Sequence, residues 1–263
     1  MARRRRPKRS NKEARRRAIY LLPNLFTTAS LFSGFFAMIE AIDGNFLVAS
    51  AAIFASLIFD GLDGRVARAT NTTSRFGVEY DSLADLVAFG AAPAVMFYVW
   101  ALRPLGRLGF LAAFLFAACG ALRLARFNVQ SDSAKPSKHF VGLPIPAAAS
   151  MLAGTVMMWT QTSLVEPIPA WVAVAMVFVL SFLMVSNIPY LSFKSLGLAR
   201  LRSFNGLVAC LLLFVLVALQ PYVMGFALLA LYVVGGPLGA RLLERGKAEK
   251  EQAEQLEHKP DHS

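Results

Sequence analysis

Charged residues are scarce in this chain of 263 residues: Asp, Glu, Lys and Arg together make up only 16% of it. A soluble domain usually has about 25%. The charges gather at both ends and in short gaps between apolar runs, and the mean hydropathy of the chain is +0.53. Runs of roughly 17–20 apolar residues are long enough to cross a hydrocarbon core about 30 Å thick. The composition therefore excludes an ordinary soluble domain and indicates an integral membrane protein.

Cysteine is also scarce, and short segments of alternating polarity are absent. The two cysteines, Cys119 and Cys210, each lie inside an apolar run. They have no metal-ligand spacing and form no disulfide framework, so we expect them to be small buried apolar side chains. The absence of alternating segments excludes a membrane β-barrel. The sequence shows no internal repeat and no second domain.

Eight apolar segments follow one another along the chain, and they predict an all-α, polytopic bundle of about eight transmembrane helices. We expect a basic tail over residues 1–20, a transmembrane domain over 21–243 and a charged tail over 244–263. The predicted segments are 21–41, 46–62, 82–101, 108–126, 142–160, 170–188, 204–220 and 223–240.

The basic residues predict the orientation. Ten of the first seventeen residues are basic, and this tail runs directly into an apolar segment, which favours a cytoplasmic membrane flank over nucleic-acid binding. The connectors 63–80, 127–141 and 189–203 are also basic, whereas the segment containing Arg103 and Arg107 is the one exception. The positive-inside rule therefore predicts that both termini lie in the cytoplasm. The membrane that we expect the protein to span is the inner membrane of the cell.

Four aspartates stand out at the edges of two neighbouring apolar segments. Asp60 and Asp63 are three residues apart, and Asp81 and Asp85 are four apart. These spacings put each pair on one helical face. Four carboxylates at one membrane depth repel one another unless they are partly protonated or bind cations. Oxygen ligands favour Mg²⁺, Mn²⁺ or Ca²⁺, and two such ions would form a clamp for displacement at phosphorus.

The residues between the aspartates suit a phosphate ligand. Gly64, Ala67 and Gly77 are small enough to let a ligand approach the backbone. Arg68 offers a guanidinium, which can hold phosphate through paired hydrogen bonds, and Ser74 offers a hydroxyl.

The same stretch resembles the signature of the CDP-alcohol phosphotransferases, which would run from 60 to 85. The resemblance implies transfer of a phosphatidyl-type group from a CDP-linked lipid to an alcohol, release of CMP, and a homodimer. The matching positions are Asp60, Asp63, Gly64, Ala67, Arg68, Gly77, Asp81 and Asp85.

Roles follow from this resemblance residue by residue. Asp60, Asp63 and Asp81 match metal ligands, and Asp85 matches a residue that both contributes to metal binding and accepts a proton. The metal would be Mg²⁺ or Mn²⁺, with two ions expected. The positions that would contact the CDP-lipid are Asn24, Thr27, Gly64, Ala67, Arg68, Ser74 and Gly77. Asn24 and Thr27 belong to a shorter match, and an N-cap and a packing hydroxyl remain the alternative for them.

Four further segments resemble the bacterial members of the family that use L-serine: 79–94, 121–129, 142–149 and 186–194. The expected partners are thus CDP-diacylglycerol, L-serine and membrane lipids, and the expected products are phosphatidylserine and CMP. Arg123 and Arg126 share a helical face, and one of them would meet the serine carboxylate or the lipid phosphate. Positive-inside anchoring is the alternative for both arginines.

Other functions remain open at this point. The same chemistry with glycerol 3-phosphate or inositol phosphate would need a denser basic pocket. A cation transporter would place acidic residues and broken helices near the bilayer midplane. A prenyl-chain transferase also uses aspartates and Mg²⁺, but the spacing of Gly64, Arg68 and Gly77 does not belong to its pattern.

Overall fold

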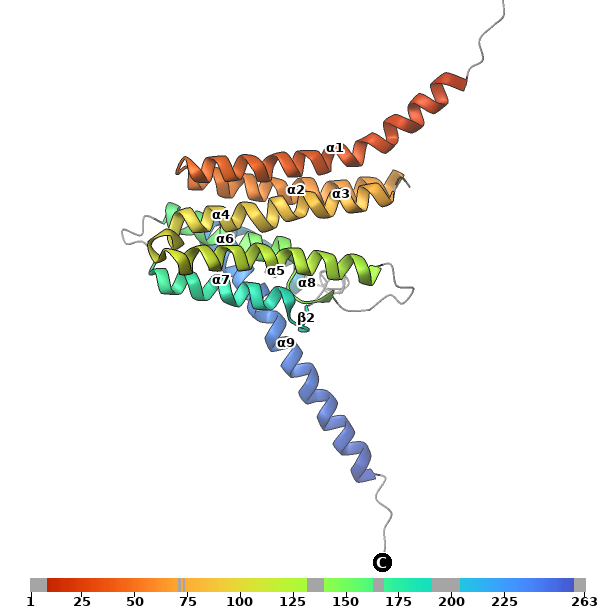
Figure 1. Cartoon of the computed structure of the whole chain (residues 1–263). Helices are drawn as coiled ribbons and strands as arrows, with labels where there is room; N and C mark the ends of the chain where they lie inside the picture. Colours follow the sequence, from red (N-terminus) through yellow and green to blue (C-terminus); the bar gives the residue numbers. More distant parts are fainter. Residues whose placement is uncertain are drawn as a thin grey trace, which may run out of the picture.

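The computed structural model describes residues 9–70, 72, 74–131, 140–162, 168–190 and 204–257, and it confirms the predicted all-α membrane bundle (Figure 1). In chain order the elements are α1 (Arg9–Ile42), α2 (Phe46–Thr70), α3 (Arg75–Asp85), η1 (Leu86–Ala91), α4 (Ala92–Phe97), η2 (Tyr98–Leu102), η3 (Arg103–Leu105), α5 (Arg107–Ser131), β1 (Phe140–Val141), α6 (Ile145–Gln161), α7 (Ala170–Val185), β2 (Pro189–Tyr190), α8 (Phe204–Leu219) and α9 (Pro221–Glu257). The two short strands pair antiparallel, with Phe140 opposite Tyr190.

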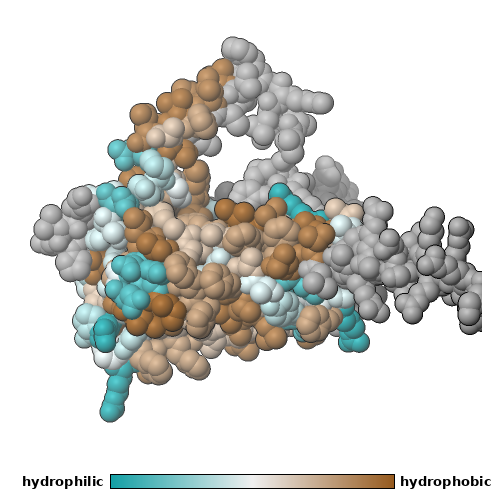
Figure 2. All heavy atoms as spheres, turned by 90° about the horizontal axis from the view of Figure 1, so that it is seen from above, coloured by the Kyte–Doolittle hydropathy of each residue, from teal (hydrophilic) through white to brown (hydrophobic). Residues whose placement is uncertain are grey.

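Each of the eight predicted apolar segments falls on a helical run, although the number of membrane crossings remains a prediction. Within the described residues, five helices are long and apolar enough to cross a membrane, and α7 is a shorter apolar helix. Figure 2 shows apolar side chains over the middle of one face and hydrophilic side chains toward its two ends. The five candidate spans are Leu22–Ile42, Phe46–Thr70, Arg75–Leu105, Arg107–Gln130 and Pro221–Gly239.

The helices around the aspartates are longer than their apolar segments. Helix α2 continues to Thr70, and a continuous helical run from Arg75 to Leu105 replaces the predicted span 82–101. Ser74 begins this run as an N-cap, because its hydroxyl accepts the N–H of Gly77 at 3.0 Å. The run includes two π-helical segments, η1 and η2, of which η1 directly follows Asp85. π-Helical turns are frequent at functional sites. The four aspartates therefore lie inside helices.

Small residues bring α1 and α2 close together along their length. The hydroxyl groups of Ser30 and Ser56 lie 2.7 Å apart, and both side chains are buried. Gly34 faces η1, where a Cβ on it would stand 2.5 Å from the Cα of Ala88. Without a strong hydrophobic force between helices inside a lipid bilayer, such close contacts are a main source of helix association.

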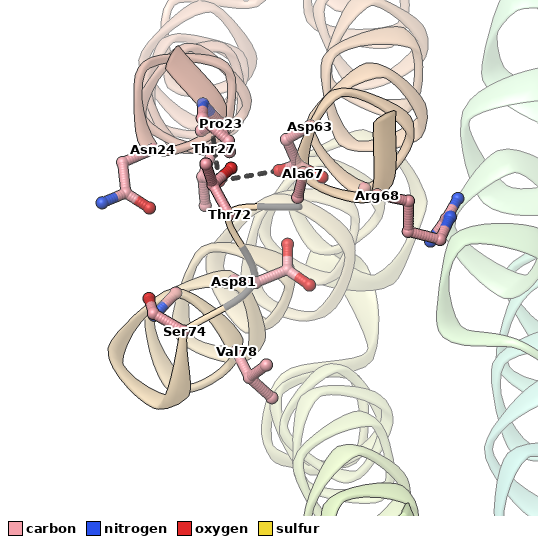
Figure 3. Close-up of a pocket in the computed structure, with 12 residues that line it drawn as sticks. Pro23, Asn24, Thr27, Asp63, Ala67, Arg68, Thr72, Ser74, Val78 and Asp81 are labelled. Atoms are coloured by element: carbon pink, nitrogen blue, oxygen red, sulfur yellow. Dashed lines mark hydrogen bonds between the residues drawn. The ribbon is translucent and has the colours of Figure 1, made fainter. Parts of the chain in front are cut away.

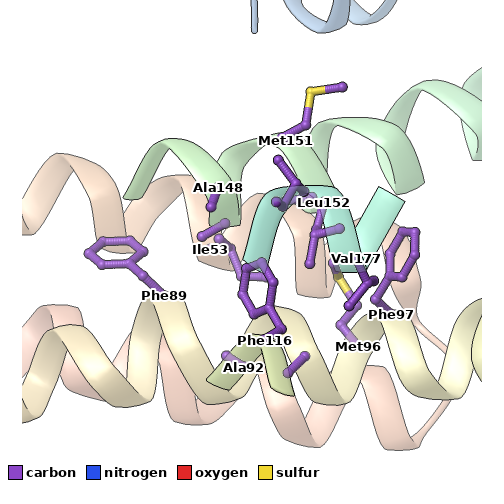
Figure 4. Packing of buried hydrophobic residues seen from close by; sticks show 14 of the residues in the cluster. Ile53, Phe89, Ala92, Met96, Phe97, Phe116, Ala148, Met151, Leu152 and Val177 are labelled. Atoms are coloured by element: carbon purple, nitrogen blue, oxygen red, sulfur yellow. The ribbon is translucent and has the colours of Figure 1, made fainter. Parts of the chain in front are cut away.

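A buried apolar core lies behind the layer formed by α1 and α2. Figure 4 shows Phe89, Phe97 and Phe116 packed with Ile53 and Leu152, all of them almost completely buried. Cys119 is buried in the same core, as expected, whereas the side chain of Cys210 lies outside the described residues. The core ties the run from η1 to η2 to α2, α5 and α6, and so fixes the direction in which α3 enters the bundle.

Both ends of the described chain extend beyond the bundle as helices. The first turns of α1 project from the end of the bundle where α2 and α3 are joined, whereas α9 leaves the bundle from its underside (Figure 1). Helix α1 begins inside the predicted tail 1–20 and α9 continues past residue 243, while the predicted domain boundaries remain predictions. Most of the basic connectors 127–141 and 189–203 lies outside the described residues.

The contact between Gly34 and η1 allows a stability test. We expect Gly34→Ala to lower the free energy of unfolding by about 1–3 kcal/mol, because the new methyl group would push against the backbone of Ala88. Gly225→Ala is the matched control, since a Cβ there meets nothing within 4 Å. It should be neutral or stabilising by up to about 1 kcal/mol. Thermal unfolding in detergent measures both, and equal melting temperatures would contradict the close packing.

Candidate active site

Two neighbouring helices carry the four aspartates in two layers. Helices α2 and α3 run in opposite directions, so Asp63 lies beside Asp81 and Asp60 lies beside Asp85. The second pair is about one helical turn, roughly 5 Å, deeper in the bundle. The spacings of three and four therefore bring all four side chains together, as the sequence predicts.

The carboxylate oxygens are close enough to share a cation. One oxygen from each of Asp60, Asp63 and Asp81 lies within 4.8 Å of the others. Asp63 is only 5% exposed, and the hydroxyl of Thr27 on α1 donates to its Oδ2 at 2.7 Å. Oδ1 of Asp85 is buried and accepts no hydrogen bond from the described residues.

These residues fit a divalent cation. The donors are all carboxylate oxygens, which suit hard ions such as Mg²⁺ and Mn²⁺. Bound positive charge would offset the repulsion among the aspartates. The buried Oδ1 of Asp85 receives no hydrogen bond from the described residues. A bound cation would therefore also stabilise this oxygen.

A cavity of about 180 Å³ opens beside the outer pair of carboxylates (Figure 3). It lies between α1, α2 and α3, and the side chains of Asp63 and Asp81 border it. All seven residues predicted to contact a CDP-lipid line this cavity: Asn24, Thr27, Gly64, Ala67, Arg68, Ser74 and Gly77.

Glycine at position 77 keeps the cavity open. A Cβ on Gly77 would stand 3.2 Å from the Oγ of Ser74 and 3.6 Å from the Oδ1 of Asn24. Two polar groups therefore converge on the space that a larger side chain would fill. On the opposite wall, a Cβ on Gly64 would meet the guanidinium of Arg68 at 3.3 Å. In Figure 3 this guanidinium points away from Asn24 and Ser74.

Three lining residues are absent from the predicted set: Pro23, Thr72 and Val78. Thr72 is buried, and its hydroxyl lies 2.7 Å from that of Thr70. Thr72 could have been identified from the sequence, because it is a hydroxyl residue only two positions before Ser74. Pro23 and Val78 gave no such signal, because apolar residues are common throughout this chain.

The two arginines of α5 have different environments. Arg126 is exposed and donates to Oδ1 of Asn187 at 2.7 Å and to the carbonyl of Val185 at 3.4 Å, so it joins α5 to the end of α7 and to the residues that follow it. Arg123 is half-buried and interacts electrostatically with Asp85. Its Nε is buried and has no hydrogen-bond partner among the described residues. Of the two, Arg123 is the one beside the carboxylates.

The match to a family model explains this combination of carboxylates and cavity. Residues 20–185 match the model described as CDP-alcohol phosphatidyltransferase, and the chain belongs to this family. The family depends in general on divalent metals, which agrees with the aspartate cluster. The match also makes the chain a multi-pass membrane enzyme and disfavours a transporter or a prenyl-chain transferase.

Several similar proteins have one and the same printed name, CDP-diacylglycerol–serine O-phosphatidyltransferase. The one from Helicobacter pylori (strain ATCC 700392 / 26695) is 45% identical over 67% of this chain and 74% of its own. The one from Mycobacterium tuberculosis (strain ATCC 25618 / H37Rv) is 34% identical over 85% of this chain and 79% of its own. The one from Bacillus subtilis (strain 168) is 35% identical over 69% of this chain and 96% of its own.

Cation binding can be measured without any reaction. We expect Asp63→Asn to weaken Mn²⁺ binding by about tenfold or more, and Thr27→Val to weaken it by about tenfold through the lost hydrogen bond to Asp63. Electron paramagnetic resonance of free Mn²⁺ in detergent gives both affinities. Asp43→Asn is the control, because Asp43 is an exposed acid in the α1–α2 connector. Equal affinities in all variants would argue against a cation at the aspartates.

Proposed function

We propose that this chain transfers the phosphatidyl group of CDP-diacylglycerol to the hydroxyl of L-serine, forming phosphatidylserine and releasing CMP. The family membership and the names of the relatives support this reaction. The structural observation that carries it is the cavity of predicted CDP-lipid contacts beside a cluster of aspartates. Glycerol 3-phosphate and inositol phosphate are the alternative acceptors within the same chemistry.

The CDP part of the lipid would occupy the cavity between α1, α2 and α3. Asn24 and Ser74 would offer polar contacts there, and Gly77 leaves room for a ligand to approach the helix start. Arg68 would have to turn from its position beside Gly64 to pair with a phosphate.

We assign the metal to the four aspartates, with Asp60, Asp63 and Asp81 as ligands and Asp85 as a further contributor. Two ions, Mg²⁺ or Mn²⁺, are proposed. When bound, they supply positive charge for the diphosphate and for the leaving CMP. Thr27 would hold the Asp63 carboxylate in a fixed orientation for this task.

Asp85 is the proposed proton acceptor. Its buried Oδ1 accepts no hydrogen bond from the described residues, so a lone pair remains for the serine hydroxyl. As that proton moves to Asp85, the serine oxygen forms a bond to the phosphorus that carries diacylglycerol. The bond from this phosphorus to the CMP oxygen breaks, and CMP leaves with its electron pair.

Arg123 is the proposed contact for the serine carboxylate. It lies beside Asp85 and therefore on the deeper side of the aspartates, away from the cavity. A serine bound by Arg123 would present its hydroxyl to Asp85. Arg126 already has two acceptors, one on the last residue of α7 and one just after this helix, which favours a structural role for it.

We further propose that the enzyme lies in the cell's inner membrane as a homodimer, with the aspartates and both termini at the cytoplasmic face. The basic N-terminal tail supports this orientation. The departure of the first turns of α1 from the end of the bundle where α2 and α3 are joined supports a common side for the N-terminus and the site. The family resemblance implies the homodimer.

Release of CMP tests the reaction. We expect purified protein with CDP-diacylglycerol and Mn²⁺ or Mg²⁺ to release CMP only when L-serine is added. Glycerol 3-phosphate and inositol phosphate should give no more than the sample without an alcohol. Asp85→Asn should lower the rate by about 10²–10⁴-fold, since the amide cannot accept the proton. Asp43→Asn should retain full activity. A response to another alcohol would contradict serine as the acceptor, and no CMP from folded protein would contradict the enzyme.

The two arginines give a second test. We expect Arg123→Gln to raise the KM for L-serine by about tenfold or more and to leave the KM for CDP-diacylglycerol within about twofold, because a charged hydrogen bond is lost only from the acceptor. Arg126→Gln should lower the melting temperature and change the KM for serine by less than about threefold. Steady-state kinetics and thermal unfolding separate these outcomes. The reverse pattern would assign the acceptor to Arg126.

A further inference from the structure

Two adjacent threonines tie α1 to both of the helices that carry the aspartates. Thr27 donates to Asp63 on α2, and its neighbour Thr28 lies 2.9 Å from the phenol oxygen of Tyr80 on α3. Tyr80 directly precedes Asp81 in the chain. The proposed reaction uses the first of these links, through the Asp63 carboxylate, and assigns nothing to the second.

The hydroxyl of Thr28 fixes the direction of the second link. A hydroxyl has a single hydrogen, and that of Thr28 is donated to the backbone carbonyl of Asn24 at 2.7 Å, one turn earlier on α1. The Thr28 oxygen therefore accepts the hydrogen of Tyr80. A chain of two hydrogen bonds thus runs from Tyr80 through Thr28 to the backbone of Asn24.

The ring of Tyr80 is oriented by its own helix. It stacks on the ring of Phe76, one turn earlier, with centroids 5.9 Å apart and planes at 13°. Phe76 is 68% exposed, and neither ring belongs to the buried core that the described residues form. Phenylalanine at position 80 would keep this stack, so the hydroxyl can be removed without disturbing the core.

The linked turn of α1 faces the start of α3 across the cavity. Oδ1 of Asn24 lies 3.6 Å from the position that a Cβ on Gly77 would take, and Oγ of Ser74 lies 3.2 Å from the same position. Figure 3 shows Asn24 and Ser74 on the same side of the cavity. Thr28 and Tyr80 join the two helices about one turn further along than Asn24 and Gly77. Their link therefore sets how far apart the two walls stand at this end.

The carboxylates border the cavity away from this end. Asp81 lies seven residues, about 10 Å, further along α3 than Ser74. A diphosphate held by cations at the aspartates would thus leave Asn24 and Ser74 for the nucleoside. The polar side chain on α1 can contact a nucleoside only while α1 keeps its distance from α3.

We propose that Tyr80 is a positioning residue for the nucleotide: through Thr28 it holds α1 at the distance from α3 at which Asn24 contacts the nucleoside of a CDP-lipid. This inference rests on the proposed use of the cavity for the CDP part of the lipid and deepens it. Tyr80 itself touches neither the nucleotide nor the cations. Removal of its hydroxyl should therefore weaken nucleotide binding and leave cation binding unchanged.

The test measures binding of CDP to full-length protein in detergent with Mn²⁺ by titration calorimetry. We expect Tyr80→Phe and Thr28→Val each to weaken CDP binding by about three- to tenfold, because either change removes the same hydrogen bond between two helices. Thr28→Ser keeps the hydroxyl and should bind CDP within about twofold of wild type. The Mn²⁺ affinity without nucleotide should stay within about twofold in all three variants.

Ser30→Ala is the matched control for a lost hydroxyl link on α1. It breaks the buried contact with Ser56 on α2, which lies outside the residues that line the cavity. We expect it to lower the melting temperature and to leave the CDP affinity within about twofold. A CDP affinity as low as that of Tyr80→Phe would mean that such links only stabilise the bundle, and would overturn the inference.

A double variant tests whether Tyr80 acts through Thr28. Adding Tyr80→Phe to Thr28→Val should weaken CDP binding by less than about twofold further, since both changes act on one link. Equal CDP affinities in wild type and folded Tyr80→Phe would contradict the inference.

CDP binding needs no acceptor, so the two proposals can fail separately. Wild-type protein that releases no CMP with L-serine would contradict the serine transfer, and weaker CDP binding by Tyr80→Phe would still support the positioning role. Absence of CDP binding by the wild-type protein would overturn the proposed use of the cavity together with this inference.

Discussion

Mutual repulsion among buried carboxylates is the constraint to which the rest of this bundle is adapted. Three carboxylate oxygens lie within 4.8 Å of one another inside a chain that is 56% hydrophobic. At such a distance each ionised pair costs roughly 3 kcal/mol at an effective dielectric constant of about 20. The helices that carry the aspartates must therefore be held together by contacts elsewhere, and by any cation that binds between them.

The holding contacts are distributed along the length of the helices. The buried pair of Ser30 and Ser56 joins α1 to α2, and Gly34 lets η1 approach α1. On the far side of η1, a Cβ on Gly120 would meet Ile145 and lie 3.8 Å from the Cα of Gly90. Close packing of this kind resists separation of the helices. It therefore opposes the repulsion among the carboxylates, which would otherwise push α2 and α3 apart.

Local spacing explains which parts of the site could be predicted from sequence. Residues three or four apart on a helix share a face whatever surrounds them, and this rule brought the four aspartates together. The cavity residues from 64 to 77 lie on both sides of one short connector, so they also had to be neighbours. The different environments of Arg123 and Arg126 could not be predicted, because Asn187 is distant in the chain and reaches Arg126 only through tertiary packing.

The chemistry explains why part of the site lies inside the domain shared by the family and part can lie outside it. Every alcohol acceptor needs the same activated CDP-lipid, and the aspartates and cavity that suit this task all lie within residues 20–185. Acceptors differ in the groups beside their hydroxyl, so the residues that distinguish them do not have to belong to the shared domain. Helix α9 lies outside it, and its position depends on the carbonyl that Pro237 leaves free for the hydroxyl of Tyr190. A missing hydrogen bond within α9 thus becomes the contact that ties the last helix to the segment beside Arg126.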